Sequence, residues 1–116
     1  MKVIIAGGRG FKDYGALRDF CDKTLSRQTT VEIVSGTANG ADKLGERYAK
    51  ERGYVLTRFP ADWGKFGKGA GHIRNREMAE CADALIAFWD GESRGTKHMI
   101  DTAKQRGLKV RVFKYK

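Results

Sequence analysis

The sequence predicts an α/β protein of three layers, in which a five-stranded, mainly parallel sheet lies between helices on both of its faces. Short apolar runs rich in β-branched residues alternate with segments whose apolar residues recur at spacings of three and four. Helical crossovers join parallel strands, and we expect the strand order 3-2-1-4-5. In that order the turns after the first and fourth strands lie side by side at the carboxyl edge of the sheet, where ligands bind. The 116 residues suit a single domain covering residues 1–116.

The first half of the chain predicts three strands and two helices. Residues 2–6 form a largely β-branched run of the kind found in strands that are covered on both faces. In residues 13–28 apolar side chains recur every three or four positions, and Asp13 stands where a helix cap is expected. A second helix begins within residues 35–42 and ends at Gly53, because glycine suits the left-handed conformation that closes helices. The other strands are expected at residues 31–35 and 54–59.

The second half of the chain begins with an irregular stretch. Residues 60–71 show no apolar period and predict a long loop that serves as a lid over a sugar or base. A helix follows at residues 72–81, with Arg74, Asn75 and Arg76 in its first turn. Because the helix dipole disfavours cations there, a negative partner is expected nearby. The remaining elements expected are a strand at 83–89, a helix at 96–106 closed by Gly107, and an edge strand at 108–113.

The chain carries 23 lysines and arginines against 14 aspartates and glutamates, a net charge of +9. This excess indicates an anionic partner, such as a nucleotide, a nucleotide derivative or a nucleic acid. Much of the excess lies in the last residues of the chain, where basic side chains would also protect an edge strand from pairing with another chain. Solubility is therefore the alternative explanation of the charge.

Membrane, disulfide and metal chemistry are not expected from the sequence. No apolar run reaches the roughly 18 residues of a membrane span, and the N-terminus passes directly into a strand pattern, so we expect a cytoplasmic protein. Cys21 and Cys81 stand among apolar helical residues and are expected to be reduced thiols. No cysteine and histidine pair has metal-ligand spacing. The cofactor that stays open is Mg²⁺ carried by a phosphate ligand.

Three turns between a strand and a helix are rich in small residues, at residues 7–10, 35–42 and 90–96. Small residues let an anion approach the backbone, and the amides and dipole of a helix N-terminus favour negative charge. One such turn would suit a tight corner equally well, but three at one edge favour a shared phosphate site. Asp42 and Asp90 would orient a ribose or a magnesium ion, and Asp42 would equally stabilise its own helix. The turns also supply Gly7, Gly8, Arg9, Ser35, Gly36, Thr37, Ser93, Gly95 and Thr96 as ligand-binding candidates.

Two residues of the helix at 72–81 extend this site. Arg74 would clamp a phosphate with two N–H bonds, and Asn75 would read a ribose or a base edge. The alternative for Arg74 is an ordinary surface ion pair with Glu77 or Asp83.

The aromatic and imidazole side chains leave alternatives open. Trp63 and Phe66 would stack on a base or anchor the loop equally well. His72 could act as a general base, but a loop histidine without a carboxylate partner is more often inert. His98 is interpreted as structural.

Several motifs resemble the small stand-alone YspA-type branch of the SLOG superfamily. They are Gly7-Gly8-Arg9, residues 35–42, residues 59–63, Arg74-Asn75 and residues 87–96. The resemblance covers nearly the full length and implies a Rossmann-like fold, an origin in bacteria or phages, and a nucleotide-derived ligand, which in other superfamily members is an ADP-ribose species. Many relatives dimerise, and Phe88 and Trp89 would favour a homodimer, although the sequence leaves the oligomeric state open.

Two better-known branches of the superfamily imply rival functions. LOG-type phosphoribohydrolases use an arginine similar in position to Arg74 and a glutamate at whose position Met99 stands here. Methionine cannot act as an acid or base, which argues against that mechanism unless Asp90 or Glu92 substitutes. DprA-type proteins bind single-stranded DNA and share a Ser-Gly stretch and an Arg-Asn pair, although Asn39 replaces their arginine before the second glycine.

We therefore predict that the chain binds a nucleotide or a nucleotide-derived ligand, as a sensor or a processing module. The alternatives are a phosphoribohydrolase, with Arg74, Asp90 and Glu92 as candidate catalytic residues, and a single-stranded nucleic-acid binding protein. Whether the protein is an enzyme stays open. The ligand-binding candidates are Gly7, Gly8, Arg9, Ser35, Gly36, Thr37, Asp42, Trp63, Arg74, Asn75, Asp90, Ser93, Gly95 and Thr96.

Overall fold

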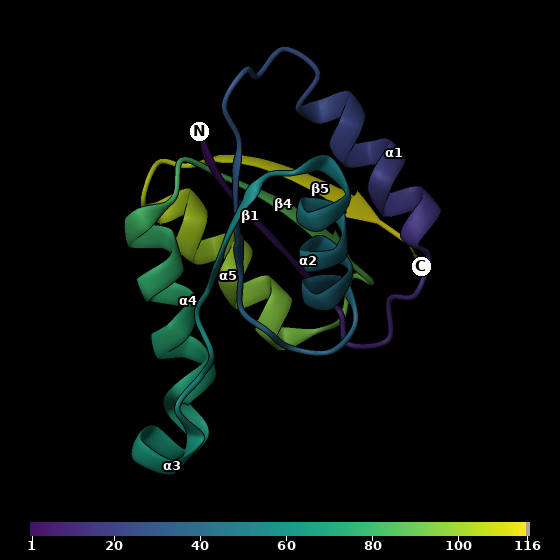
Figure 1. Cartoon of the computed structure of the whole chain (residues 1–116). Helices are drawn as coiled ribbons and strands as arrows, with labels where there is room; N and C mark the ends of the chain where they lie inside the picture. The colour runs from purple at the N-terminus through teal and green to yellow at the C-terminus, as the bar shows by residue number, and fades with distance from the viewer. Residues whose placement is uncertain (116) are drawn as a thin grey trace.

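The computed structural model describes residues 1–115 and has the predicted architecture, a parallel five-stranded sheet with helices on both faces (Figure 1). The strand order β3-β2-β1-β4-β5 confirms the expected order. β1 and β4 pair in parallel at the centre, with Gly7 opposite Phe88 at their carboxyl ends. The turns after these two strands are therefore neighbours. The strands are β1 (Lys2–Gly7), β2 (Glu32–Ser35), β3 (Val55–Arg58), β4 (Ala84–Trp89) and β5 (Lys109–Lys114).

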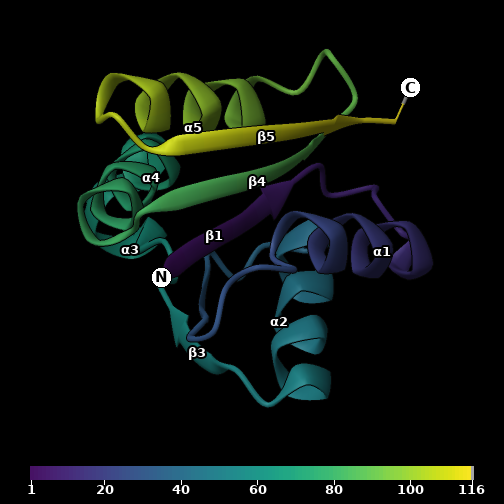
Figure 2. The same ribbon diagram turned by 90° about the horizontal axis from the view of Figure 1, so that it is seen from above.

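Two helices cover each face of the sheet. Figure 2 shows α1 (Tyr14–Thr24) and α2 (Ala41–Arg52) on one side, and α4 (Ala70–Cys81) and α5 (Arg94–Gln105) on the other. Side chains alternate between the two faces along each strand, so β1 contributes to two apolar cores. Val3 and Ile5 pack with α1 and α2, whereas Ile4 and Ala6 pack with α4 and α5.

The helix boundaries follow their local capping chemistry. Asp13 accepts the Ala16 N–H at 3.0 Å and begins α1, which ends at Thr24, four residues before the predicted end. Gly53 is left-handed, with a φ of 70°, and closes α2 as expected. Ser93 accepts the Thr96 N–H at 3.4 Å, so α5 begins at Arg94, two residues before its predicted start.

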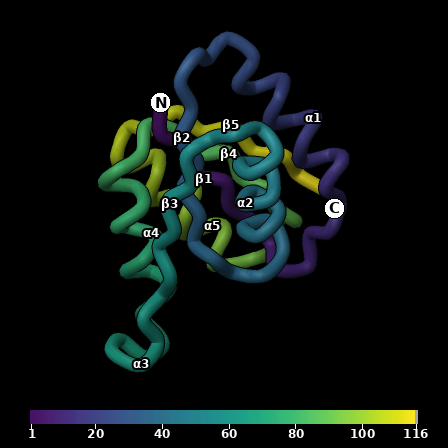
Figure 3. Tube along the Cα trace, in the orientation of Figure 1, coloured from purple at the N-terminus to yellow at the C-terminus, as the bar shows by residue number. Residues whose placement is uncertain are grey.

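The expected loop at residues 60–71 is wrong for most of its length. Asp62 accepts the Lys65 N–H at 3.0 Å and caps the short helix α3 (Trp63–Phe66). Gly67, with a φ of 58°, turns the chain into a single 3₁₀ turn, η1 (Gly67–Gly69), and α4 follows directly. We call residues 62–69 the finger. Figures 1 and 3 show it extending from the lower end of α4, away from the sheet.

This correction also moves Arg74 along its helix. α4 begins at Ala70 rather than at His72, so Arg74 and Asn75 lie in the second turn. The predicted conflict with the helix dipole does not arise there, because the dipole acts mainly over the first turn. The contacts of Arg74 must therefore explain its role.

The end of β4 does not offer the apolar surface that we expected for a homodimer. Phe88 is fully buried among the rings of Phe11, Phe20 and Phe113. Trp89 is half-buried and donates its indole N–H to the Ser93 carbonyl at 3.1 Å. A homodimer stays a prediction that would need another surface.

The sequence also led us to expect reduced thiols and no membrane-spanning helix. Cys21 is buried and Cys81 is half-buried, and both are free thiols. Within residues 1–115, no helix has both the length and the apolar character needed to cross a membrane.

Candidate functional site

A cleft of about 720 Å³ opens at the carboxyl edge of the sheet. Its walls come from the turn after β1, the N-terminus of α5, one side of α4 and the finger. The predicted candidates that line it are Gly7, Gly8, Arg9, Asp42, Trp63, Arg74, Asn75, Asp90, Ser93, Gly95 and Thr96. The structure thus gathers residues from five separate segments of the sequence around one cavity, with Asp42 contributed by the start of α2.

The wall formed by the β1 turn consists mostly of backbone. The Gly8 N–H donates to the Phe88 carbonyl at 3.0 Å, which fastens the turn to β4. A Cβ atom on Gly7 would lie 2.3 Å from that same carbonyl oxygen, so glycine is required. The Tyr115 hydroxyl lies over Gly8, only 2.2 Å from where a Cβ would be. A ligand at this wall would meet the backbone, the Tyr115 hydroxyl and the exposed Arg9 side chain.

The opposite wall is the N-terminus of α5. Asp90 accepts the N–H groups of Glu92 and Ser93, both at 2.8 Å, and this fixes the turn that precedes the helix. Ser93 caps the Thr96 N–H. The first-turn amides of Arg94 and Gly95 have no acceptor within the helix, because a helix leaves its first N–H groups unsatisfied. Together with the helix dipole, they make this wall favourable for an anion.

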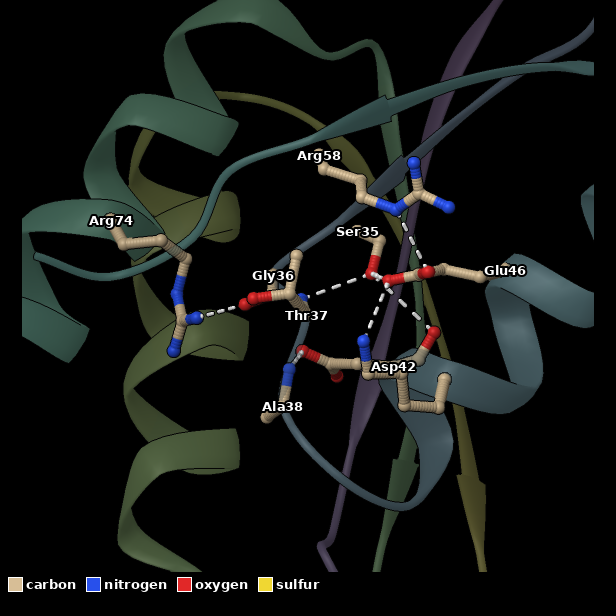
Figure 4. Close-up of polar contacts among 9 residues, drawn as sticks. Ser35, Gly36, Thr37, Ala38, Asp42, Glu46, Arg58 and Arg74 are labelled. Atoms are coloured by element: carbon tan, nitrogen blue, oxygen red, sulfur yellow. Dashed lines mark hydrogen bonds and ion pairs between the residues drawn. The ribbon is translucent and has the colours of Figure 1, made fainter.

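The side chain of Arg74 extends from α4 to the turn after β2. Its Nη1 donates to the Gly36 carbonyl, as Figure 4 shows, and its Nε donates to the Asn75 side-chain oxygen at 3.0 Å. Burial lowers the pKa of Arg74, the Asp42 carboxylate raises it, and the charge of Arg9 lowers it again. Arg9 and Arg74 both line the cleft, so two guanidinium groups belong to one cavity.

Asp42 is an acid on this otherwise basic wall and is only 4% exposed. Its Oδ2 accepts the Ala38 N–H at 3.2 Å. Burial raises the pKa of Asp42 to about 6, although the Ala38 amide and the Arg74 charge lower it. A Cβ on Gly36 would lie 2.8 Å from both Arg74 Nη1 and Asp42 Oδ2, so glycine lets the two charged groups approach each other.

The polar side chains of the β2 turn point into the protein rather than into the cleft. Ser35 is fully buried; its hydroxyl donates to Glu46 at 2.8 Å and accepts the Thr37 N–H at 3.0 Å. Glu46 in turn pairs with Arg58 at 3.0 Å. Thr37 has a φ of 66°, which is unusual for a β-branched residue. Ser35, Gly36 and Thr37 therefore hold Arg74 and Asp42 in place without lining the cavity, whereas Ala38 and Asp42 at the end of this turn do line it.

Asn75 connects α4 to α5. It is 5% exposed, and its amide nitrogen lies 3.4 Å from the Gly95 carbonyl and 3.1 Å from His98 Nδ1. The ring of His98 stacks on His72 with centroids 3.8 Å apart. The contacts of Asn75 are internal to the wall, so it positions its neighbours.

The finger contributes two side chains to the lining of the cleft. Trp63 and Lys68 line the cavity, and Trp63 is 52% exposed, so one part of its ring is available to a ligand. Phe66, which is 42% exposed, does not line the cavity.

Four predicted candidates lie outside the cleft lining. Ser35, Gly36 and Thr37 belong to the supporting β2 turn, and Glu92 is exposed beyond the α5 wall. Conversely, the predicted ligand-binding set did not contain Tyr115, Lys68, His72 or Met99, which all line the cavity. Tyr115 could have been found from the expected pairing of the last strand with the fourth.

Among residues 1–115, no three histidine, cysteine, aspartate or glutamate side chains lie close enough together to hold a metal ion. The acids that a Mg²⁺ ion carried by a phosphate would meet in the cleft are Asp42 and Asp90. Binding of the predicted Mg²⁺ would therefore require a phosphate ligand that carries the ion into the cleft.

Comparison with known proteins places the chain in a family. The profile of the YspA, cpYpsA-related SLOG family matches residues 1–66, more than half of the chain. The chain belongs to this family. The Gene 61 protein of Mycobacterium phage D29 is 36% identical, in a match that covers 94% of this chain and 93% of the phage protein. These matches confirm the resemblance drawn from the sequence motifs.

A solved structure shares the fold. DNA processing protein A from Helicobacter pylori, whose structure concerns a single-stranded DNA binding mode, matches 100% of this chain with a TM-score of 0.71 and 20% identity. This chain spans only 66% of that protein. The likeness extends to the arrangement of strands and helices.

Proposed function

We propose that the cleft binds a nucleotide or a nucleotide-derived ligand through its phosphate. The observation that carries the proposal is the meeting of three anion-binding features in one cavity. These are the backbone wall at Gly7 and Gly8, the N-terminus of α5 at Gly95, and the guanidinium groups of Arg9 and Arg74. Each of them favours negative charge, and together they surround one space.

The size of the cavity favours a ligand larger than phosphate. About 720 Å³ lies within the range of roughly 300–1,000 Å³ that is common for small-molecule sites. Trp63 provides an aromatic surface on the finger, where a base would stack, and Lys68 of the finger also lines the cavity as a further cation. A nucleotide would place its phosphate between the anion-binding walls and its base against Trp63.

The acids in and around the cleft favour binding without hydrolysis. Met99 is buried in the wall at the position where the LOG-type motif has glutamate. Asp90 Oδ1 accepts two backbone N–H bonds, and Glu92 lies outside the lining. The proposed role is therefore that of a sensor or a ligand-carrying module rather than a phosphoribohydrolase.

The proposal is tested by native mass spectrometry and calorimetry with AMP, NAD and ADP-ribose. We expect saturable binding of one molecule per chain, with no change of its mass over time. Arg9→Gln should weaken binding, whereas Arg27→Gln, an exposed arginine in the segment between α1 and β2, removes the same charge away from the cleft. Equal losses in both variants, or no binding by the unmodified chain, would reject the proposed site.

A second candidate function is binding of single-stranded nucleic acid. Six cations near the carboxyl edge form no ion pair within the part of the chain that the structure describes: Arg9, Lys12, Lys65, Lys68, Arg94 and Lys114. The exposed rings of Trp63 and Phe66 on the finger would stack on successive bases. The structural neighbour from Helicobacter pylori is described as binding single-stranded DNA.

The salt dependence of binding separates the two candidates. A strand that contacts several phosphates loses affinity steeply as salt rises, because each contact releases counterions. A single nucleotide in the cleft has a shallow dependence. Titration with AMP and with a short oligonucleotide at several salt concentrations therefore decides which ligand fits the protein.

A further inference from the structure

The buried amide of Asn75 joins the two walls of the cleft. Its oxygen accepts the Arg74 Nε–H at 3.0 Å, and its nitrogen approaches the Gly95 carbonyl and His98 Nδ1. Arg74 belongs to the α4 wall and Gly95 to the first turn of α5. One side chain thus sets the position of the guanidinium group relative to the N-terminus of the helix.

The chemistry of its partners fixes the orientation of this amide. Arginine Nε can only donate a hydrogen bond and a carbonyl can only accept one, so the Asn75 oxygen faces Arg74 and its NH₂ group faces Gly95. The same NH₂ group faces His98 Nδ1 at 3.1 Å, and that nitrogen must therefore accept. His98 is held as the neutral imidazole that carries its proton on Nε2.

A proton on His98 Nδ1 would face the Asn75 NH₂ group, and two hydrogen-bond donors in this position repel each other. The surroundings of His98 favour the neutral form on balance. Burial lowers the pKa of His98, as do His72, stacked on it at 3.8 Å, and Arg76 of α4, whereas Asp101 of α5 raises it. His98 is therefore neutral at neutral pH and is protonated only in more acidic solution.

We propose that His98 is a positioning residue for the phosphate site: its neutral imidazole fixes Asn75, and through Asn75 it fixes Arg74 and the first turn of α5. Protonation of His98 turns this acceptor into a donor, so the Asn75 amide rotates to present its oxygen to His98, and Arg74 loses that oxygen and keeps its hydrogen bond to the Gly36 carbonyl. The arrangement itself does not depend on the proposed function, and only its effect on ligand affinity does.

The predicted effect on binding has an unusual sign. Acidification normally strengthens the binding of an anion, because acids such as Asp42 in the cleft lose their charge. Here the protonation of His98 loosens Arg74, so the contribution of Arg74 to ligand affinity falls as the pH is lowered. With ADP-ribose, whose diphosphate charge does not change between pH 5 and pH 8, the His98 component should weaken binding by about threefold to tenfold.

Two substitutions separate the hydrogen bond from the charge. His98→Asn places an acceptor oxygen near the position of Nδ1 and does not titrate, so Arg74 should stay fixed at every pH. His98→Leu removes the acceptor, so Arg74 should be loose at every pH. Asp42 is present in all three proteins, and its own titration therefore cancels in the comparison.

The test is an NMR titration of ¹⁵N-labelled protein without ligand, which keeps it independent of the proposed function. The chain has two histidines, so His72→Gln assigns the remaining imidazole signals to His98. We expect the Nε2–H tautomer at neutral pH, and an Arg74 Nε–H signal that shifts or broadens with the midpoint of His98. In His98→Asn the Arg74 signal should not follow pH in this way.

A Nδ1–H tautomer, or an Arg74 signal that ignores the titration of His98, would overturn the proposal even if ligands bind. If ADP-ribose does not bind but the Arg74 signal follows His98, the positioning role stands and the ligand assignment fails. The tautomer and the pH dependence of the Arg74 signal are read from the unmodified protein, and His72→Gln serves only to assign the imidazole signals.

Discussion

The turns after β2 (residues 35–42) and after β4 (residues 90–96) both contain serine, glycine and threonine, and both lead into a helix at the same edge of the sheet. In the β2 turn the Ser35 hydroxyl is fully buried against Glu46, and Asp42 takes the Ala38 amide. In the β4 turn Ser93, Gly95 and Thr96 line the cleft. The first part of the β2 turn, residues 35–37, supports the cavity, and only Ala38 and Asp42 of that turn line it, whereas the β4 turn forms a wall.

This difference shows that turn composition does not distinguish a ligand wall from its support. What separates them is the environment: α2 brings Glu46 and Asp42 beneath the β2 turn, so its polar groups find partners inside the protein (Figure 4). α5 offers no such acids beneath the β4 turn. Substitutions in residues 35–37 of the β2 turn and in their partners should therefore change stability, and substitutions in the β4 turn should change binding.

The largest expected effect comes from the charge of Asp42. Its pKa is raised to about 6 in the folded protein from 3.8, so the folded state holds a proton that the unfolded state has lost. Stability from this group is therefore full below pH 4 and is lost as pH rises through 6, a change of ~3 kcal/mol. Asp42→Asn keeps an oxygen for the Ala38 N–H and should remove this dependence.

The measurement is urea unfolding of both proteins at several pH values between 4 and 7.5. As pH rises, the free energy of unfolding of Asp42→Asn should increase relative to that of the unmodified chain. Parallel pH profiles would show that Asp42 titrates normally and is not buried as described.

The next effect concerns Glu46, for which the chain offers a matched control. Glu46 and Glu80 each pair with an arginine at 3.0 Å, but Glu46 is buried and Glu80 is exposed. Glu46→Ala removes the acceptor of the buried Ser35 hydroxyl and should lower the free energy of unfolding by about 2 kcal/mol. Glu80→Ala should change it by less than about 0.5 kcal/mol. Equal losses in urea unfolding would contradict a supporting role for the β2 turn.

The smallest effect concerns Thr37, whose positive φ is strained for a β-branched residue. Thr37→Gly should raise the free energy of unfolding by up to about 1 kcal/mol, because relief of the strain exceeds the entropy lost with glycine. Thr29→Gly, in an exposed segment without positive φ, should lower stability instead. Thermal unfolding compares the stabilities of Thr37→Gly and Thr29→Gly. A loss of stability in both variants would mean that Thr37 is not strained.

The strand order and most element positions could be predicted from the sequence because apolar periodicity and local caps specify them. Residues 3–6 of β1 and all of β4 are uninterrupted apolar runs, and Asp13 and Gly53 mark helix ends. The finger could not be predicted, because its glycines hide any period and the cap at Asp62 is its single local signal.

The site was predicted only in part for a different reason. Side-chain direction in the β2 turn depends on Glu46, which lies eleven residues beyond Ser35 and reaches it only through the packing of α2. Tyr115 enters the cleft because β5 pairs with β4, with Lys114 opposite Trp89. Both facts follow from tertiary packing, which a local motif does not encode.

The most direct test of the α5 wall as an anion site uses Gly95. A Cβ at Gly95 meets nothing within 4 Å, and Asp is favourable in the first turn of a helix, so Gly95→Asp should fold at least as stably as the unmodified chain. Gly95→Asn has the same size without the charge. Calorimetry with AMP, NAD and ADP-ribose should show binding weakened at least about tenfold in Gly95→Asp but only slightly in Gly95→Asn. Equal affinities of the two variants, or no binding by the unmodified chain, would contradict an anion site at this wall.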